Sequence, residues 1–308
     1  MDLKELNLLK RLCEIHAPSG NEGALKDFLL EYIEKQSKNW KVQPDIFSGD
    51  HLQDCIILKF GKPRTAIFAH IDSIGFTVRY ENQLIPIGGP ETKTGYQLVG
   101  HDSLGPIECE LQVDKENRLF YDFARPIETG TDLTFKCNFI QDDEYIQSCY
   151  LDNRLGVFNA LKVAEKLQDG IIAFTTYEEH GGGSMPFVLK FIQENFPVYQ
   201  GLVSDITWVT DGVHHGEGVV ISLRDRNIPR KAFLKKIKDI AQSTNIPYQL
   251  EVEAEGSSDG REIQHSPYPM DWCFIGAPES NVHSPEETVH INDINSMIAL
   301  YSTLMEQL

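Results

Sequence analysis

This chain of 308 residues has little positive charge, with 28 Lys and Arg against 46 Asp and Glu and a formal charge of −18. A protein that binds the phosphate backbone of nucleic acid or an anionic membrane surface needs basic patches. The longest basic stretch here is short and runs from Lys231 to Lys238. We therefore expect neither nucleic acid nor a membrane among the partners of this protein.

Long apolar runs and paired cysteines are also missing. No segment approaches the ~20 apolar residues that span a bilayer, and the first residues lack the order of a secretory signal. We therefore expect a soluble, cytoplasmic protein. The six cysteines are scattered without a C-x-x-C pair, which predicts buried reduced thiols rather than disulfides or a thiolate zinc site. Any bound metal must then be held by histidine and carboxylate.

The apolar pattern predicts an α/β fold with an all-β insert. Helical stripes fill the first forty residues, and a strand pair, residues 55–60 and 65–70, follows them. From about residue 76 to 146, short alternating segments are separated by turn residues, and no helical stripe occurs. After Tyr150, apolar strands alternate with amphipathic helices. This order is typical of helices packed on a sheet that a small β domain interrupts.

Polar clusters follow the predicted apolar strands, where open α/β sheets bind their ligands. They are His70-Ile71-Asp72, Asp152-Asn153-Arg154, Glu178-Glu179, Asp205 and His283. Alone, each has an ordinary interpretation, such as a surface turn, a solvated helix face or a helix cap. Together, imidazole and carboxylate groups without cysteine fit an open catalytic site for two divalent ions.

The number of these groups suits two ions and one base. Two neighbouring cations need a bridging carboxylate, so two histidines, one bridging Asp and two further carboxylates account for both ions. Glu178 and Glu179 adjoin at a strand end and point differently. One of them can therefore bind metal, while the other acts as a general base on the water between the ions. Asp72 is placed to orient the imidazole of His70.

The motif order resembles that of the glutamyl and deblocking aminopeptidases, dinuclear-zinc exopeptidases that include the tetrahedral aminopeptidases and proteins once called endoglucanases. The matching segments are Ala17-Pro18-Ser19-Gly20 with Glu22, His70-Ile71-Asp72, Leu151-Asp152-Asn153-Arg154-Leu155-Gly156, Glu178-Glu179, Asp205, Ser258-Asp259 and His283-Ser284-Pro285. Eighty positions separate Asp72 from Asp152. This spacing accommodates the β insert and favours this family over relatives in which the two motifs lie close together.

The resemblance implies a mixed β-sheet sandwiched by helices, with an inserted small β-barrel-like domain. Residues 1–72 plus 149–308 would form the catalytic domain, and residues 73–148 the insert, which serves oligomerisation. The implied ligands are His70 and Asp205 for one ion, Glu179 and His283 for the other, and Asp152 as the bridge. Glu178 would be the general base, with Asp72 supporting His70. The peptide bond after Asp152 is often cis in this family.

We expect a metal-dependent aminopeptidase that hydrolyses the N-terminal peptide bond of peptides through a bridging water or hydroxide activated by Glu178. The ions would be zinc, with cobalt or manganese as alternatives, and the protein a homo-oligomer, dimeric or larger. Asp259 is a candidate for binding the free α-amine, and Arg224 or Arg261 for favouring acidic residues. The alternatives are an amidohydrolase acting on N-acylated small molecules, a metal-free glycoside hydrolase and an inactive scaffold.

Overall fold

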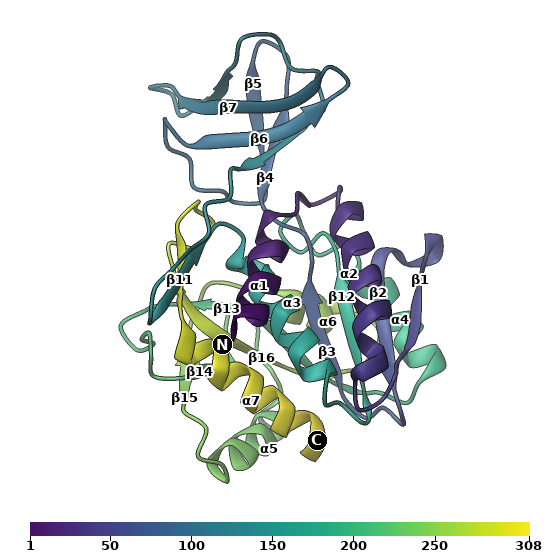
Figure 1. Cartoon of the computed structure of the whole chain (residues 1–308). Coiled ribbons are helices and arrows are strands. Elements are labelled where there is room, and N and C mark those ends of the chain that lie inside the picture. Colours follow the sequence, from purple (N-terminus) through teal and green to yellow (C-terminus); the bar gives the residue numbers. More distant parts are fainter.

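The computed structural model describes residues 1–308, and Figure 1 shows a large α/β body from which a small barrel of strands projects. The expected fold class is confirmed. None of the helices has the length and apolar composition needed to cross a bilayer. All six cysteines are unpaired and five of them are buried, as the spacing predicts.

The α/β body is organised by a sheet of 11 strands. In spatial order these are β1 (Asp45–Gly49), β2 (Gln53–Phe60), β12 (Gly170–Thr175), β3 (Ala66–His70), β13 (Gln200–Trp208), β16 (Asp271–Ser280), β17 (Glu287–His290), β11 (Tyr145–Ser148) and β10 (Ile140–Gln141), while β14 (Val219–Arg224) pairs with β16 and β15 (Tyr248–Val252) with β14. Strands β12, β3, β13 and β16 run parallel. Their carboxyl ends therefore meet at one edge of the sheet.

Helices cover both faces of this sheet. They are α1 (Leu3–Glu14), α2 (Gly23–Gln36), α3 (Leu151–Ala164), α4 (Met185–Asn195), α5 (Lys231–Gln242), α6 (Asp259–His265) and α7 (Ile291–Gln307). Alternate residues of a strand point to opposite faces, so Ile172 of β12 belongs to the apolar core that includes residues of α1, α2, α3, α5 and α7, whereas Ile171 belongs to the core that includes residues of α4 and α6. Two apolar cores thus hold the sheet from either side.

The strand pair expected from residues 55–60 and 65–70 is wrong in one respect. Strands β2 and β3 form as expected but do not pair with each other, because β12 lies between them, antiparallel to β2 and parallel to β3. Every residue of β12 is buried. Its backbone groups therefore need hydrogen-bond partners along both edges, and the two earlier strands supply them.

The insert is a closed, antiparallel barrel of six strands. In order around the barrel they are β4 (Gly75–Val78), β5 (Gln83–Ile87), β8 (Leu119–Asp122), β7 (Gly105–Val113), β6 (Gln97–Asp102) and β9 (Asp132–Phe135). A separate apolar core that includes Phe76, Leu111 and Leu133 fills it, and closure leaves no free strand edge. Strands β10 and β11, which fall within residues 73–148, belong to the large sheet instead.

A candidate metal centre at the carboxyl end of the sheet

The chemically active side chains of the predicted set converge at the edge where the parallel strands end. His70 is the last residue of β3, Asp205 lies in β13, and Glu179 lies in the turn that follows β12. Asp152 stands at the start of α3, and His283 lies between β16 and β17. The strand order, the start of α3 and the loop after β16 therefore bring together residues more than 200 positions apart in the chain.

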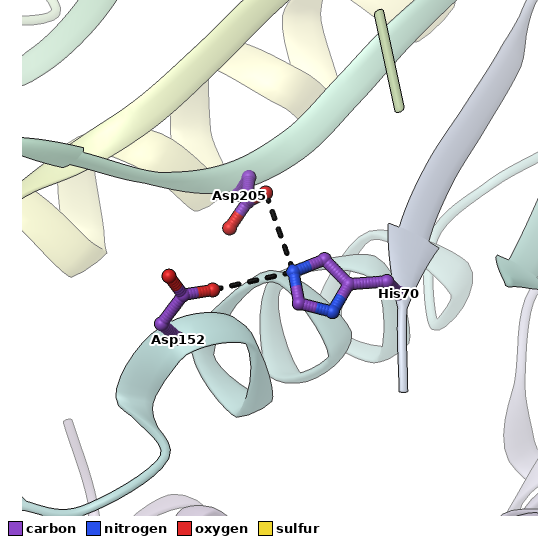
Figure 2. Close-up of side chains that lie close together, drawn as sticks. All are labelled: His70, Asp152 and Asp205. Atoms are coloured by element: carbon purple, nitrogen blue, oxygen red, sulfur yellow. Dashed lines mark ion pairs between the residues drawn. The ribbon is translucent and has the colours of Figure 1, made fainter. Parts of the chain in front are cut away.

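The first cluster joins His70, Asp152 and Asp205, all three buried. The Nε2 atom of His70 lies 3.2 Å from Oδ1 of Asp152 and 3.4 Å from Oδ2 of Asp205. Figure 2 shows the two carboxylates approaching the same imidazole nitrogen from different elements. One nitrogen and two carboxylate oxygens thus face a common point.

The second cluster joins His283 to Asp152 and Glu179. The Nε2 atom of His283 lies 3.3 Å from Oδ2 of Asp152 and 3.2 Å from Oε2 of Glu179. Asp152 therefore directs one oxygen to each histidine. In each cluster the three candidate ligand atoms lie within 4.8 Å of one another, which is the arrangement of two adjacent sites that share a carboxylate.

The electrostatics of this centre fit bound cations. Burial opposes protonation of His283, but Asp152 and Glu179 outweigh it and raise the pKa of this imidazole to about 12. Burial, together with the charge of Asp152, raises the pKa of Glu179 to about 7. His70 Nε2, Asp152 Oδ1 and Glu179 Oε1 are buried without a hydrogen-bond partner. Nitrogen and oxygen donors with excess negative charge are suited to divalent zinc-like ions.

Glu178 stands beside both clusters without belonging to either. Its Oε2 lies 3.9 Å from Nε2 of His70, farther than the carboxylates of Asp152 and Asp205. Its side chain is 17% exposed, and burial raises the pKa of its carboxyl group well above the ordinary value. Glu178 lines a cavity of about 250 Å³ that opens onto the centre. A carboxyl group so placed can exchange protons with a molecule in the cavity.

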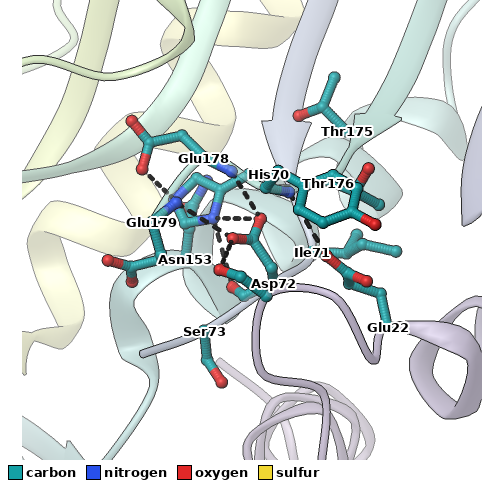
Figure 3. A network of polar contacts seen from close by, with 12 residues as sticks. Glu22, His70, Ile71, Asp72, Ser73, Asn153, Thr175, Thr176, Glu178 and Glu179 are labelled. Carbon is teal, nitrogen blue, oxygen red and sulfur yellow. Dashed lines mark hydrogen bonds and ion pairs between the residues drawn. The ribbon is translucent and has the colours of Figure 1, made fainter. Parts of the chain in front are cut away.

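Asp72 ties the strand of His70 to the turn that carries the two glutamates (Figure 3). Its carboxylate accepts hydrogen bonds from the backbone N–H groups of Glu178 at 3.1 Å and Glu179 at 3.0 Å, and from the hydroxyl of Ser19 at 2.6 Å. One carboxylate oxygen also lies 3.5 Å from Nδ1 of His70. Asp72 therefore sets the relative positions of an imidazole and both glutamates without facing the cavity.

The segment around Asp152 packs tightly against β13. Asn153 donates from Nδ2 to the carbonyl of Ser204 at 2.8 Å, and the peptide bond between Asp152 and Asn153 is cis. A Cβ added to Gly156 would lie 2.1 Å from the same Ser204 carbonyl oxygen. Only glycine allows this approach, which explains its place four residues after Asp152.

The side chain of Arg154 fixes the segment that follows β3. Its guanidinium is buried and donates to the backbone carbonyls of Leu12 at 3.2 Å, Asp72 at 3.2 Å and Ile71. These three carbonyls belong to α1 and to the loop after β3. Arg154 thus joins three segments whose relative positions determine where His70 points.

Two positioning groups were not identified from the sequence. Glu287 accepts the backbone N–H groups of Asp152 at 3.2 Å and His283 at 3.0 Å. The only available signal was a glutamate at the start of an apolar strand, four residues after His283. The second group is the carbonyl of Gly89, which accepts Nδ1 of His283 at 3.1 Å.

Gly89 belongs to the loop that follows β5, so the insert reaches back into the site. The neighbouring Gly88 donates its backbone N–H to Nδ1 of His180 at 3.2 Å. Glu91 donates its own N–H to the carbonyl of His283 at 2.8 Å. His180 therefore anchors this loop, and the loop in turn contacts His283 at two points.

Asp259 does not line the cavity. Its side chain is 1% exposed, and Oδ2 accepts a hydrogen bond from the hydroxyl of Thr175 at 2.6 Å. Its neighbour Ser258 instead donates to Oδ2 of Asp205 at 2.6 Å. Neither Arg224 nor Arg261 lines the cavity. The polar loop thus contacts the centre through Ser258, whereas Asp259 lies behind the sheet edge.

Sequence comparisons cover most of these positions. Residues 110–300 match the model of a family described as M42 glutamyl aminopeptidase. A curated relative from Acetivibrio thermocellus with the provisional name aminopeptidase is 26% identical over 331 residues, which covers 96% of each chain. SgcX from Escherichia coli strain K12, provisionally named an aminopeptidase too, is 23% identical and covers 95% of this chain and 91% of its own.

Solved structures share the fold over nearly the whole chain. An aminopeptidase from the archaeon Desulfurococcus kamchatkensis superposes with a TM-score of 0.88 at 22% identity, covering 99% of this chain and 95% of its own. The TET1 peptidase of Pyrococcus horikoshii, which can assemble into a tetrahedron or a large octahedral shell, has a TM-score of 0.83 at 21% identity, with 99% and 100% coverage. At such identities the likeness concerns the fold.

Proposed function

This chain belongs to the M42 glutamyl aminopeptidase family of metal-dependent hydrolases, and we propose that it removes N-terminal residues from peptides at the centre around Asp152. The resemblance inferred from the motif order is thereby confirmed. The observation that carries the proposal is the position of Asp152, whose two oxygens lie 3.2 Å and 3.3 Å from the imidazoles of His70 and His283.

The five ligands divide naturally between two ions. His70 and Asp205 would hold one ion, Glu179 and His283 the other, and Asp152 would contact both. Zinc suits this donor set, and cobalt or manganese are alternatives. Such ions, when bound, polarise a carbonyl oxygen and lower the pKa of water. The protein's own contribution is to fix the ligands, through Asp72 from one side and Glu287 from the other.

Glu178 is the proposed general base. Its carboxylate makes no hydrogen bond within the protein and borders the cavity, while Asp72 holds its backbone N–H. In hydrolysis of a peptide bond, Glu178 would accept a proton from the attacking water and deliver it to the nitrogen of the leaving amine. Keeping this group near both reacting atoms requires a rigid turn, which the two backbone contacts to Asp72 supply.

The test compares wild type with Glu178→Gln on aminoacyl anilides, with metal content measured on the same samples. We expect Glu178→Gln to retain two metal ions per chain and to lose about 10²–10⁴-fold in kcat. The matched control is Glu194→Gln, which changes an exposed glutamate of α4. Glu178→Gln turnover equal to wild type, or a wild-type protein without stoichiometric metal, would refute the mechanism.

A second substrate pair separates the aminopeptidase from the amidohydrolase. Leucine anilide carries a free α-amine, whereas N-acetyl-leucine anilide does not. We expect release of aniline from leucine anilide only. Release of acetate from the acetylated compound, with no aniline from either compound, would favour a deacylase built on the same centre.

We also propose that the chain forms homo-oligomers. The related TET1 peptidase of Pyrococcus horikoshii assembles into closed shells, and the barrel of this chain exposes large apolar side chains at Tyr80, Ile85 and Leu104. One chain has a mass of 34.9 kDa. Light scattering coupled to size exclusion should give a whole-number multiple of this mass, and a mass equal to that of one chain would refute the proposal.

A further inference from the structure

The cavity beside the metal centre continues into a pocket whose charged lining is acidic. Beyond the residues already assigned, it is lined by the carboxylates of Asp225, Glu251, Glu253 and Glu255. No lysine or arginine lines the cavity, and its one basic residue is His283, which faces Asp152 and Glu179. The pocket therefore presents negative charge without a counter-charge of its own.

Two of these acids are buried. Asp225 is 6% exposed and Glu251 is 4% exposed. Oδ1 of Asp225 accepts the backbone N–H of Asn227 at 2.5 Å, and Oε1 of Glu251 accepts the hydroxyl of Thr207 at 2.5 Å. Burial raises the pKa of both carboxyl groups, and contacts with the side chains of Asn227 and Ser222 offset this only in part. A carboxylate removed from water in this way is costly unless a cation joins it.

The nearby arginines do not supply that cation. Arg226 donates its backbone N–H to the carbonyl of Gly256 at 3.2 Å, but its side chain does not line the cavity and pairs with no carboxylate. Arg224 donates from Nε to the backbone carbonyl of Asp225 rather than to its carboxylate. Arg230 pairs with Asp271 at 3.1 Å. Arg261 pairs with Glu262 at 3.6 Å. The acids of the pocket thus remain available to a ligand.

The rest of the pocket suits an alkyl chain. Trp208, Phe274 and Val282 contribute apolar surface to the lining. Ile206, Thr207 and Trp208 continue β13 directly beyond Asp205 and line the same cavity, so the pocket adjoins the candidate metal ligands. A side chain bound there would lie beside both the apolar walls and the acids. Lysine and arginine have this construction, an aliphatic stem with a charged end.

We propose that this pocket receives the side chain of the substrate's N-terminal residue and selects lysine or arginine. The inference rests on the proposed aminopeptidase function and identifies its substrate class. Recognition of an N-terminal glutamate, which the family description suggests, would need a cation in the pocket. Glu253 and Glu255, nearer the surface, add negative potential that attracts cationic peptides.

The experiment uses the zinc-loaded full chain and anilides of lysine, norleucine and glutamate. Norleucine has the lysine stem without the ammonium group, so the ratio of the two kcat/KM values isolates the charge. We expect wild type to favour lysine over norleucine by about tenfold or more, and glutamate to be the poorest substrate. Glu251→Gln and Asp225→Asn should each lower the lysine to norleucine ratio by about tenfold. The matched control, Glu116→Gln on the exposed barrel surface, should keep the wild-type ratio.

Each other outcome overturns the inference. Equal wild-type values for lysine and norleucine would refute the cationic preference, and this measurement requires no variant to fold. If Glu251→Gln lowered kcat/KM equally for lysine and norleucine anilides, the acids would bind the α-amine instead of the side chain. Hydrolysis of norleucine anilide without preference for lysine would leave the aminopeptidase proposal standing. Hydrolysis of none of the anilides would reject both.

Discussion

The carboxylate of Glu287 accepts a hydrogen bond from the backbone N–H of His283 at 3.0 Å, and its other oxygen accepts one from Asp152 at 3.2 Å. Glutamine can accept through only one side-chain atom. We therefore expect Glu287→Gln to weaken zinc binding by about 10–100-fold, measured by competition with a chelator. The exposed neighbour offers a matched control, Glu286→Gln. Unchanged zinc affinity in Glu287→Gln would show that these backbone contacts do not position the ligands.

Removal of metal should destabilise the fold. Without cations, the buried carboxylates of Asp152, Glu179 and Asp205 repel one another, since only two imidazoles lie among them. Zinc at 100 times its dissociation constant would stabilise the folded chain by about 2.7 kcal/mol. We expect a lower thermal midpoint after chelation and its recovery on addition of zinc. The rise in thermal midpoint on addition of zinc should be unchanged in Glu178→Gln and smaller in Asp205→Asn. A rise of the same size in both variants would exclude Asp205 as a ligand.

Arg154 should be essential for stability rather than for chemistry. It donates to the buried carbonyls of Leu12, Ile71 and Asp72. Its removal would leave the Ile71 carbonyl without a donor, which costs about 1–3 kcal/mol, and would take one of two donors from each of the other carbonyls. We expect Arg154→Met to lower the free energy of unfolding by about 3 kcal/mol or more, as measured by urea denaturation. The exposed Arg64, with one bond to a terminal carbonyl, serves as control, and Arg64→Met should stay within about 0.5 kcal/mol. Equal stability of the two variants would contradict this role.

Close packing makes Gly156 irreplaceable. An alanine Cβ would lie 2.1 Å from both the carbonyl of Ser204 and the side chain of Asn153, so α3 would have to move away from β13. We expect Gly156→Ala to cost about 1–3 kcal/mol and to lower zinc affinity, because Asp152 moves with the helix. Gly23→Ala, where nothing lies within 4 Å, should be neutral or stabilising. A Gly156→Ala protein as stable as wild type would disprove the clash.

Acid should weaken the barrel through Asp102. Its carboxylate receives two bonds from the guanidinium of Arg125, at 2.6 Å and 2.8 Å, and this contact lowers the pKa of Asp102 to about 2. A lowered folded-state pKa gives stability that is fully present above the unfolded value of about 3.9 and is lost as pH falls toward 2. The thermal midpoint of Asp102→Asn should therefore lie below that of wild type at neutral pH. The difference between the two thermal midpoints should become smaller as the pH falls from 4 to 2. A difference that stays constant over this range would show that the ion pair does not stabilise the barrel.

Local patterns are sufficient to predict the main elements and to nominate candidate metal ligands. His70 and Asp205 each end or interrupt an apolar run, and such positions meet at one sheet edge whenever the strands are parallel. The spacing between Asp72 and Asp152 also predicts the insert. These features depend on residues within a few positions of one another, or on order along the chain.

Features created by long-range pairing were not predictable in this way. The place of β12 between β2 and β3 depends on which strands pair, which a single sequence leaves open. Gly89 acts through its backbone carbonyl, and the carboxylate of Glu287 binds backbone N–H groups of residues far away in the chain, so no local pattern reveals either role. Asp259 looked suitable for an amine because of its charge, but its helix turns it toward Thr175. Side-chain direction at such points depends on packing that only the folded chain defines.

The hydrogen bond between Nδ1 of His283 and the carbonyl of Gly89 links a candidate metal ligand to the inserted barrel. A carbonyl can only accept, so the proton of the neutral imidazole must reside on Nδ1, which leaves the Nε2 lone pair free for a cation. The tautomer of a catalytic-domain histidine is thus set by a peptide group of the inserted domain. Deletion or exchange of the barrel together with the loop at Gly88 and Gly89 would release that tautomer, so a change in the inserted strands can alter the chemistry of a histidine outside them.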